Sequence, residues 1–446
     1  MTQSLSVSRR SRPSPFAALP HYLAVLVVLA TLTLTVLGPW MTYKPEPYTG
    51  EGSPLRQLCY FAVFPLAIAA VRPLNRPSRL FAMPLLLVMA LLWSWVSVRW
   101  AIAPDMAVRR LLLTTIVIWT IFLAVEDLGY TKTMKLIRVA LIATLIANYV
   151  TVIFIPHFGI HQLELSVSRS GVDPGLVGDW RGMMLQKNFA GAACAITLLV
   201  FSLDARRVRA WVRILVIAAS ILFLVKSGSK TSMGLSVLGL GLGWLFMRYN
   251  PVYRMFLIPL AIVAGAAAYL FVMMHWEALT APLYNQAAFT GRTLIWPPLL
   301  AFAKDHLTLG AGYGSFWNIG PGKSPIYAYA KGWVVHITQG HDGYLDLLVT
   351  IGLPGLLLVV IATIIAPLVR LLVHPNVPRA TGALLLAIVI FCAGHNFTES
   401  SLFDRDSVVQ TFLMFAVALI YKVTPSPSPW RLRAGPRQPQ PRLAHD

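Results

Sequence analysis

His341, Asp342 and Asp346 lie at the beginning of an apolar stretch, in the segment ITQGHDGYLDLLVTIGLPG at residues 337–355. Ionisable groups in such a place cost several kcal/mol and usually mark a functional site. The dipole of a helix disfavours an imidazolium at its start, so we expect His341 to be a neutral imidazole that can accept a proton. Asp342 is placed to cap the helix, and Asp346 could pair with a basic residue.

Basic side chains gather in three further segments that lead into or separate apolar stretches. Arginine offers paired hydrogen bonds and lysine a point charge, so both suit the oxygens of a diphosphate, and helix N-termini add partial positive charge. The alternative is that these cations are ordinary interfacial residues that reach towards water. The candidate diphosphate-binding residues are Arg181 and Lys187, with Asp179 and Asn188 beside them, in GDWRGMMLQKNFAG; Lys230, with Lys226 nearby, in VKSGSKTSMG; and Arg292 in GRTLIW.

A metal site is a competing interpretation of the histidines. His336 and His341 could act with Asp342, but no further ligand stands at a convincing spacing. We therefore expect neither a metal nor another cofactor, and give His336 a supporting role. The segment GAGYGSF at residues 310–316 resembles a glycine-rich phosphate loop, but it does not follow a predicted strand, so we interpret it as a turn.

The composition predicts the elements that must position these residues. Hydrophobic residues make up 57% of the 446 residues and charged residues 12%, with a mean hydropathy of +0.67. Soluble domains carry about 25% charged residues, so the chain is an all-α polytopic membrane protein. A span needs about 20 apolar residues, and we count about twelve stretches, centred near residues 30, 65, 90, 118, 145, 194, 218, 239, 263, 355, 387 and 414. The stretch at 342–373 is long enough for a kink at Pro354.

The positions of lysine and arginine predict the orientation. With both termini in the cytoplasm, the inner loops carry nearly all of the net charge of +20, as membrane topology favours. The basic balance then reflects orientation and attraction to membrane lipids, and no nucleic-acid partner is expected. The predicted division is a disordered N-terminus (1–18), spans one to nine (19–274), a large, partly helical periplasmic cap loop (275–340), spans ten to twelve (341–423) and a disordered basic tail (424–446).

The cap loop is too long to be a simple connection, and its aromatic content argues against disorder. Within it, GRTLIWPPLLAFAKDH predicts a helix with one apolar face, formed by Leu294, Ile295, Leu299, Leu300 and Phe302. We expect a folded cap over the outer leaflet.

Four motifs in order, WRGMMLQKNFAG, SGSKTSMG, GRTLIWPPLLAFAKDHLTLGAGYGSFW and GHDGYLDLLVTIGLPGLL, resemble the O-antigen ligase and polysaccharide polymerase family of bacterial inner-membrane glycosyltransferases. The resemblance covers about residues 180 to 360. The segments around Arg181 and Lys230 are more similar to exopolysaccharide polymerases than to ligases.

The resemblance implies a metal-independent transfer in the periplasmic leaflet. The donor is a glycan on undecaprenyl diphosphate, and the acceptor is a second lipid-linked glycan in a polymerase or the lipid A core in a ligase. His341 matches the proposed base, Lys230 the basic position of the short outer turn and Arg292 the arginine of the loop motif. Asp342, Asp346, Asn188 and His336 are candidate acceptor-binding or supporting residues. Ligases often have arginine and asparagine where this chain has Lys230 and Asp342, which weakens the ligase interpretation.

Two other classes of protein remain open from the sequence. A lipid-linked oligosaccharide flippase would place charges at mid-membrane depth, commonly on repeated halves, and neither feature is evident. A scaffold for a polysaccharide assembly complex would use the outer cations only for topology and for docking assembly partners. We favour the polymerase, with the O-antigen ligase as the alternative within the family.

Overall fold

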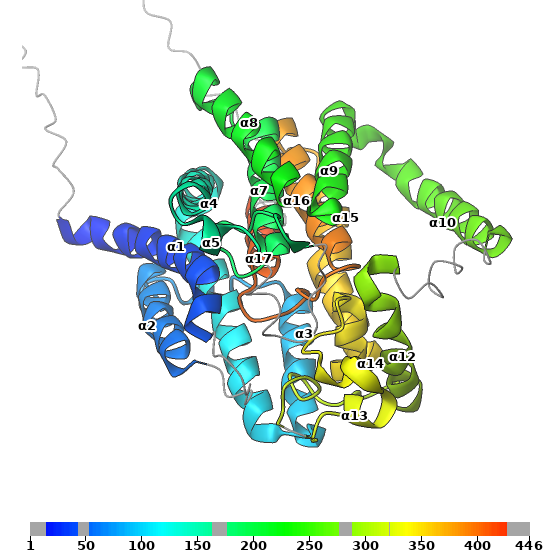
Figure 1. Cartoon of the computed structure of the whole chain (residues 1–446). Coiled ribbons are helices and arrows are strands. Elements are labelled where there is room, and N and C mark those ends of the chain that lie inside the picture. Colours follow the sequence, from blue (N-terminus) through cyan, green and yellow to red (C-terminus); the bar gives the residue numbers. More distant parts are fainter. Residues whose placement is uncertain (1–14, 43–52, 163–175, 276–287, 321, 426–446) are drawn as a thin grey trace, which may run out of the picture.

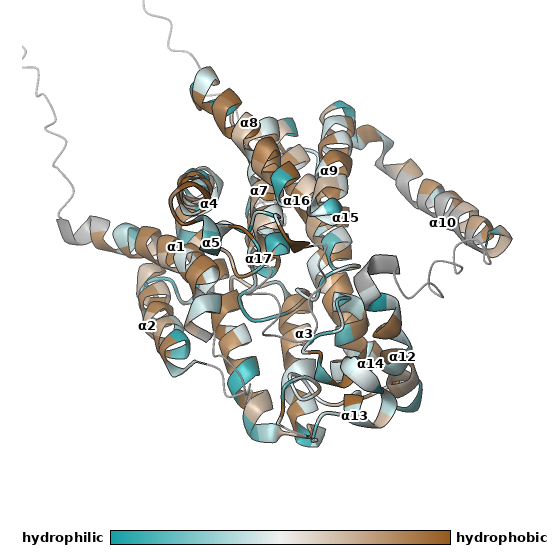
Figure 2. Ribbon diagram, viewed as in Figure 1, coloured by the Kyte–Doolittle hydropathy of each residue, from teal (hydrophilic) through white to brown (hydrophobic). Residues whose placement is uncertain are grey.

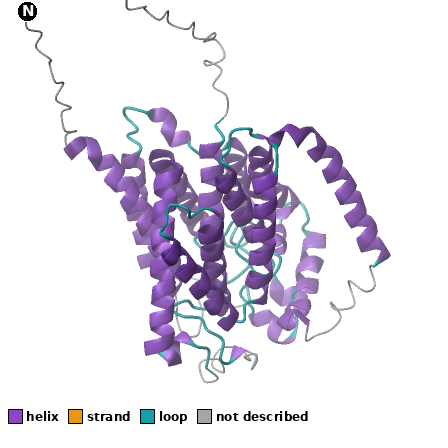
Figure 3. Ribbon diagram, turned by 90° about the horizontal axis from the view of Figure 1, so that it is seen from above, coloured by secondary structure: helices purple, strands orange, loops and turns teal. Residues whose placement is uncertain are grey.

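The computed structural model describes residues 15–42, 53–162, 176–275, 288–320 and 322–425. These residues form helices, turns and a single isolated bridge between Ile160 and Trp180, which confirms the all-α prediction (Figure 1; Figure 3). The helices are α1 (Pro15–Thr42), α2 (Pro54–Ala70), α3 (Leu85–Val96), α4 (Pro104–Phe154), α5 (Pro156–Gly159), α7 (Lys187–Leu203), α8 (Ala210–Lys226), α9 (Lys230–Arg248), α10 (Leu257–Met274), α12 (Trp296–Asp305), α13 (Ile326–Tyr329), α14 (Gly343–Val360), α15 (Ala366–Val373), α16 (Arg379–His395) and α17 (Val408–Val423).

Three helical segments in the described residues are long and apolar enough to cross a membrane: Leu19–Met41, Pro104–Phe154 and Gly343–Val373. The predicted number of about twelve spans stays a prediction, because several other apolar helices are shorter. Hydrophobic residues also lie on outward faces, for example on α8, where Trp211 and Ile214 are exposed (Figure 2). Exposed apolar side chains of this kind are what lipid covers in a membrane protein.

Glycine breaks two of the three long segments. Gly129 interrupts α4 with φ 67°, and Gly352 interrupts α14 with φ 69°. The predicted kink at Pro354 is therefore displaced by two residues, because the turn needs a left-handed backbone that glycine adopts without a steric penalty. A Cβ at Gly352 would lie 2.2 Å from the carbonyl oxygen of Thr308. The break thus lets the chain of the cap approach the backbone of α14.

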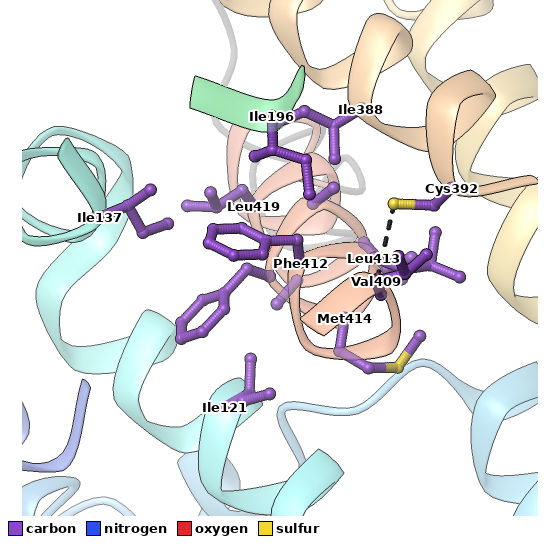
Figure 4. Close-up of a cluster of buried hydrophobic side chains, with 14 of the residues drawn as sticks. Ile121, Ile137, Ile196, Ile388, Cys392, Val409, Phe412, Leu413, Met414 and Leu419 are labelled. Atoms are coloured by element: carbon purple, nitrogen blue, oxygen red, sulfur yellow. Dashed lines mark hydrogen bonds between the residues drawn. The ribbon is translucent and has the colours of Figure 1, made fainter. Parts of the chain in front are cut away.

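Helix α17 is the centre of the main core. All residues from Val408 to Ile420 are buried, which is the pattern of a helix enclosed on every side. Figure 4 shows side chains of α4, α7 and α16 around it, including Ile121, Ile196 and Ile388. The loop that leads into α17 is consequently held by a rigid element, and this loop carries part of the candidate site.

The cap has a small core of its own. Ile295, Leu299 and Phe302 are buried as the helical pattern predicted, and they pack with Phe316 and with Val349 of α14. Leu300, which was expected on the same face, is 55% exposed, because it lies on the other side of the short helix α12. The cap is therefore folded and seated on the beginning of α14.

Candidate active site

A buried carboxylate, Glu399, joins three of the predicted site residues. It lies in the loop of residues 396–407 between α16 and α17 and is 3% exposed. Its Oε1 accepts hydrogen bonds from the guanidinium of Arg292 at 2.5 Å and from Nδ2 of Asn188 at 2.5 Å, and its Oε2 lies 3.4 Å from Nδ1 of His341. Residues from the first, third and fourth motifs therefore meet at one side chain that the sequence analysis did not single out.

The environment of Glu399 keeps it ionised. Burial alone would raise the pKa of its carboxyl group, but the hydrogen bond with His341 and the positive charge of Arg292 outweigh burial and lower the pKa to about 2. The carboxylate is then a hydrogen-bond acceptor only. It favours the His341 tautomer that carries its proton on Nδ1, which places the free electron pair on Nε2, where a base needs it.

The backbone of His341 is held in an unusual conformation. Its φ of 52° lies in the left-handed region, which costs a non-glycine residue about 1 to 3 kcal/mol. The turn is fixed from both sides: the N–H of Gly340 donates to both carboxylate oxygens of Asp346 at 3.1 Å, and the N–H of Gly343 donates to the carbonyl of Asn396 at 2.7 Å. Strain maintained by such support is typical of a functional residue.

Asp346 stabilises this turn through its contacts with Gly340. Its carboxylate also accepts a hydrogen bond from Nε1 of Trp317 at 2.8 Å, and Nε1 of Trp296 binds the carbonyl of Gly340 at 3.1 Å. The expected pairing of Asp346 with a basic residue is thus replaced by backbone and tryptophan contacts. Asp346 connects the cap to the backbone that precedes His341.

Asp342 caps α14, as its position predicted. Its Oδ1 accepts the N–H groups of Tyr344 at 2.9 Å and Leu345 at 3.0 Å. Burial raises the pKa of the Asp342 carboxyl, and the two backbone hydrogen bonds lower it in part. The Asp342 side chain is bonded to the first N–H groups of α14, so it acts on its neighbour His341 only by fixing the backbone.

We expect Asp342→Ala to lower the free energy of unfolding by about 1 kcal/mol, the usual cost of a lost N-cap. Asp342→Asn keeps an oxygen that can cap the helix, so its unfolding temperature should stay close to that of the wild type. Thermal unfolding of the purified protein measures both variants. Equal losses in the two variants would contradict the capping role and would point to the charge of Asp342.

Lys187 and Arg181 have local partners. Nζ of Lys187 lies 2.6 Å from Oδ2 of Asp179, and Nε of Arg181 donates to the carbonyl of Phe158 at 2.7 Å. The Asp179 carboxylate in turn lies against the turn before α9, since a Cβ at Gly228 would be 2.6 Å from its Oδ1. These contacts link the first motif to the second and support the loop.

Lys230 and His336 are exposed. Lys230 begins α9, and the next residue, Thr231, accepts a hydrogen bond from the hydroxyl of Thr398 at 3.0 Å. Lys230 therefore directly precedes a residue that contacts the loop of Glu399. Its charge is accessible to a ligand. No contact between His336 and His341 is found in the described ranges. Nor does any group of three His, Cys, Asp or Glu side chains there come together as metal ligands.

The segment GAGYGSF forms turns, as predicted, and also docks the cap. Nη1 of Arg110 in α4 donates to the carbonyls of Gly314 at 2.5 Å and Trp317 at 2.7 Å, and Nη2 donates to Asn318 at 2.9 Å. The Tyr313 hydroxyl donates to the carbonyl of Phe403 at 2.8 Å, in the loop that holds Glu399. The cap is thus tied to α4 and to the site.

The same loop is tied to α2 by an ion pair. The side chain of Asp406 is 1% exposed. It accepts hydrogen bonds from Nε of Arg56, at 2.8 Å, and from Nη2 of the same guanidinium. Such a two-pronged pair fixes geometry as well as charge. Residues 396–407 therefore contact α2, α7, α9, α14 and the cap.

The three segments of the described residues that are long and apolar enough to cross a bilayer indicate an α-helical membrane protein. The family model Wzy_C, described as O-antigen ligase, matches residues 214–360, from α8 to the end of α14. Over these residues the match supports the resemblance to the O-antigen ligase and polymerase family that the motifs indicated. The matched region contains Lys230, Arg292 and His341, whereas Asn188 and Glu399 lie outside it. A search of curated proteins found no match.

Proposed function

We propose that the protein is a polysaccharide polymerase that transfers a glycan from undecaprenyl diphosphate to a hydroxyl of a second lipid-linked glycan, on the periplasmic side of the bacterial inner membrane. The observation that supports the proposal most is the contact of His341 and Arg292 with one ionised carboxylate, Glu399. The family match supports glycosyl transfer of the ligase or polymerase type.

In the proposed reaction, Nε2 of His341 takes the proton of the acceptor hydroxyl while its oxygen attacks the anomeric carbon. The bond from this carbon to the diphosphate oxygen breaks, and the lipid diphosphate leaves with the electron pair. Glu399 stabilises the imidazolium that forms. The diphosphate receives the charge of Lys230 and the remaining donors of Arg292, since a guanidinium has five N–H groups. No step requires a metal ion or another cofactor.

Two features favour polymerisation over ligation to lipid A core. Lys230 stands where the resemblance to ligases implies arginine, and Asp342 where it implies asparagine. The deciding assay uses the purified protein in nanodiscs with chelator and an undecaprenyl-diphosphate-linked repeat unit, with or without lipid A core. Ladders from the donor alone establish a polymerase, and transfer only in the presence of core establishes a ligase. Absence of transfer from the native donor by folded protein favours the flippase.

Lys230→Ala is expected to reduce transfer by about 10- to 100-fold, because a cation that stabilises a leaving diphosphate contributes mainly in the transition state. Lys226→Ala is the matched control: it removes a lysine that is also exposed, four residues earlier, at the end of α8. Initial rates at equal protein level should stay within about twofold of wild type for the control. Similar rates for both variants would remove Lys230 from the proposed diphosphate site.

A further inference from the structure

A cavity lies away from the candidate active site. Its volume is about 560 Å³, and its lining includes Arg79, Phe81, Leu85, Glu126, Arg370 and Tyr421. A neighbouring cavity of about 390 Å³ shares Glu126 and Tyr421 and adds Lys422. None of these side chains belongs to the site that contains Glu399.

The cavity lies towards the opposite end of the helices from the candidate active site. Helix α4 binds the cap through Arg110 and reaches the cavity at Glu126, 16 residues or about 24 Å further along the helix. Helix α17 leaves the loop of Glu399 at Ser407 and reaches the second cavity at Lys422, about 22 Å away. These lengths approach the thickness of the apolar layer of a bilayer. With the active site on the periplasmic side, the cavity faces the cytoplasmic leaflet.

The cations of the cavity are fixed by the protein. Nε of Arg370 donates to the carbonyl and hydroxyl of Thr424 at 2.9 and 2.8 Å, and the guanidinium lies over the ring of Tyr421. Arg79 pairs with Asp127 at 3.2 Å, and Lys422 pairs with Glu126 at 2.9 Å. The lining of the two cavities has three basic side chains, Arg79, Arg370 and Lys422, and one acidic side chain, Glu126; with Asp127, the partner of Arg79, included, the net charge is +1. An anionic group is therefore the complementary ligand, and the fixed cations lose little entropy when it binds.

Large apolar side chains lie at the same cavity. Phe81 is 81% exposed and Leu85 is 73% exposed, both in the segment that contains Arg79. A soluble phosphate compound would leave these apolar side chains exposed, whereas the acyl chains of a lipid would cover them. We propose that this cavity binds the headgroup of an anionic phospholipid of the cytoplasmic leaflet, with the phosphate on Arg79 and Arg370 and the acyl chains along Phe81 and Leu85.

The test is native mass spectrometry of the detergent-solubilised full chain during titration with phosphatidylglycerol, phosphatidylethanolamine or glycerol 3-phosphate. We expect phosphatidylglycerol to bind at least about fivefold more tightly than phosphatidylethanolamine, which corresponds to about 1 kcal/mol. Glycerol 3-phosphate should not compete at similar concentration. Equal binding of the two lipids, or equal competition by the soluble phosphate, would overturn the proposal.

Variants distinguish lipid binding in the cavity from nonspecific attraction of the lipid to a basic surface. Arg79→Ala and Arg370→Ala should each weaken phosphatidylglycerol binding by about fivefold, and Arg370→Lys should recover part of the loss. Arg206→Ala is the control, because Arg206 is an exposed arginine on the same predicted face and does not line the cavity. An equal effect of Arg206→Ala would reduce the binding to a general surface attraction and contradict the assignment.

Glu126→Gln tests whether weaker lipid binding by the arginine variants is caused by misfolding. It removes the acidic charge of the lining and the ion pair with Lys422, while the hydrogen bond of Lys422 with the carbonyl of residue 126 stays, so it should tighten phosphatidylglycerol binding about two- to fivefold. A misfolded protein does not gain selective affinity. Unchanged or weaker binding by Glu126→Gln would overturn the assignment of the headgroup to this cavity.

Discussion

Glu399→Gln is expected to reduce glycosyl transfer at least about 100-fold, the lower range for loss of general acid–base catalysis. The amide has nearly the shape of the carboxylate but carries no charge. It cannot stabilise a protonated His341 by charge. Its NH₂ group is a donor, and if it faces the imidazole N–H it no longer holds the ring in the orientation that the carboxylate favours. Single-turnover rates with the lipid-linked donor measure the effect on chemistry. The same change leaves Arg292 beside a neutral group, so some stability should be lost as well.

The control for Glu399→Gln is Asp404→Asn in the same loop. Asp404 is more exposed and pairs with its neighbour Arg405, so its loss should change the rate by less than about twofold. Glu399→Asp should recover part of the activity, because it restores the charge at a greater distance from His341. A Glu399→Gln protein that unfolds at the wild-type temperature and transfers at the wild-type rate would refute the role of Glu399.

Gly312→Ala is expected to release the cap from the membrane helices. Gly312 has φ 87°, and a Cβ there would lie 2.5 Å from Cα of Ala101, in the turn between α3 and α4. Backbone cannot move aside as a flexible side chain does, so overpacking adds about 1 to 3 kcal/mol to the cost of the left-handed backbone. We expect a lower unfolding temperature, rapid proteolysis within the cap and loss of transfer.

Gly332→Ala is the matched control for this change. Gly332 also lies in the cap with a positive φ, 64°, but nothing lies within 4 Å of the position of an added Cβ. It should cost only the backbone strain, about 1 to 2 kcal/mol. Equal protease sensitivity of the two variants would show that strain, and not the contact with Ala101, controls the docking of the cap.

The sequence predicted the helical class and the apolar face of α12 because both depend on local composition and periodicity. It also singled out His341, Arg292 and Asn188, which lie in recognisable motifs and meet at Glu399, while their roles stay predictions. Glu399 was missed because it is a single acidic residue in NFTESS, outside those motifs. Its placement after the predicted eleventh span, on the same face as His341, was the available signal.

Long-range contacts account for the other differences. Arg110 looks in sequence like a charge near a helix end, yet it binds carbonyls more than 200 residues away. Lys187, by contrast, pairs with Asp179, only eight residues before it, and its contact with a diphosphate stays a prediction. The break at Gly352 depends on the close approach of Thr308, and periodicity within α14 contains no information about it.

The ion pair between Arg56 and Asp406 has a consequence for how this sequence can diverge. A change at either residue leaves the other as an unpaired charge in a site with little access to water, at a cost of about 3 to 5 kcal/mol. Exchange of both for apolar residues of similar volume avoids that cost. Residues 56 and 406 should therefore change together in evolution. A library that varies both positions at once should yield functional double variants whose two single substitutions are each non-functional.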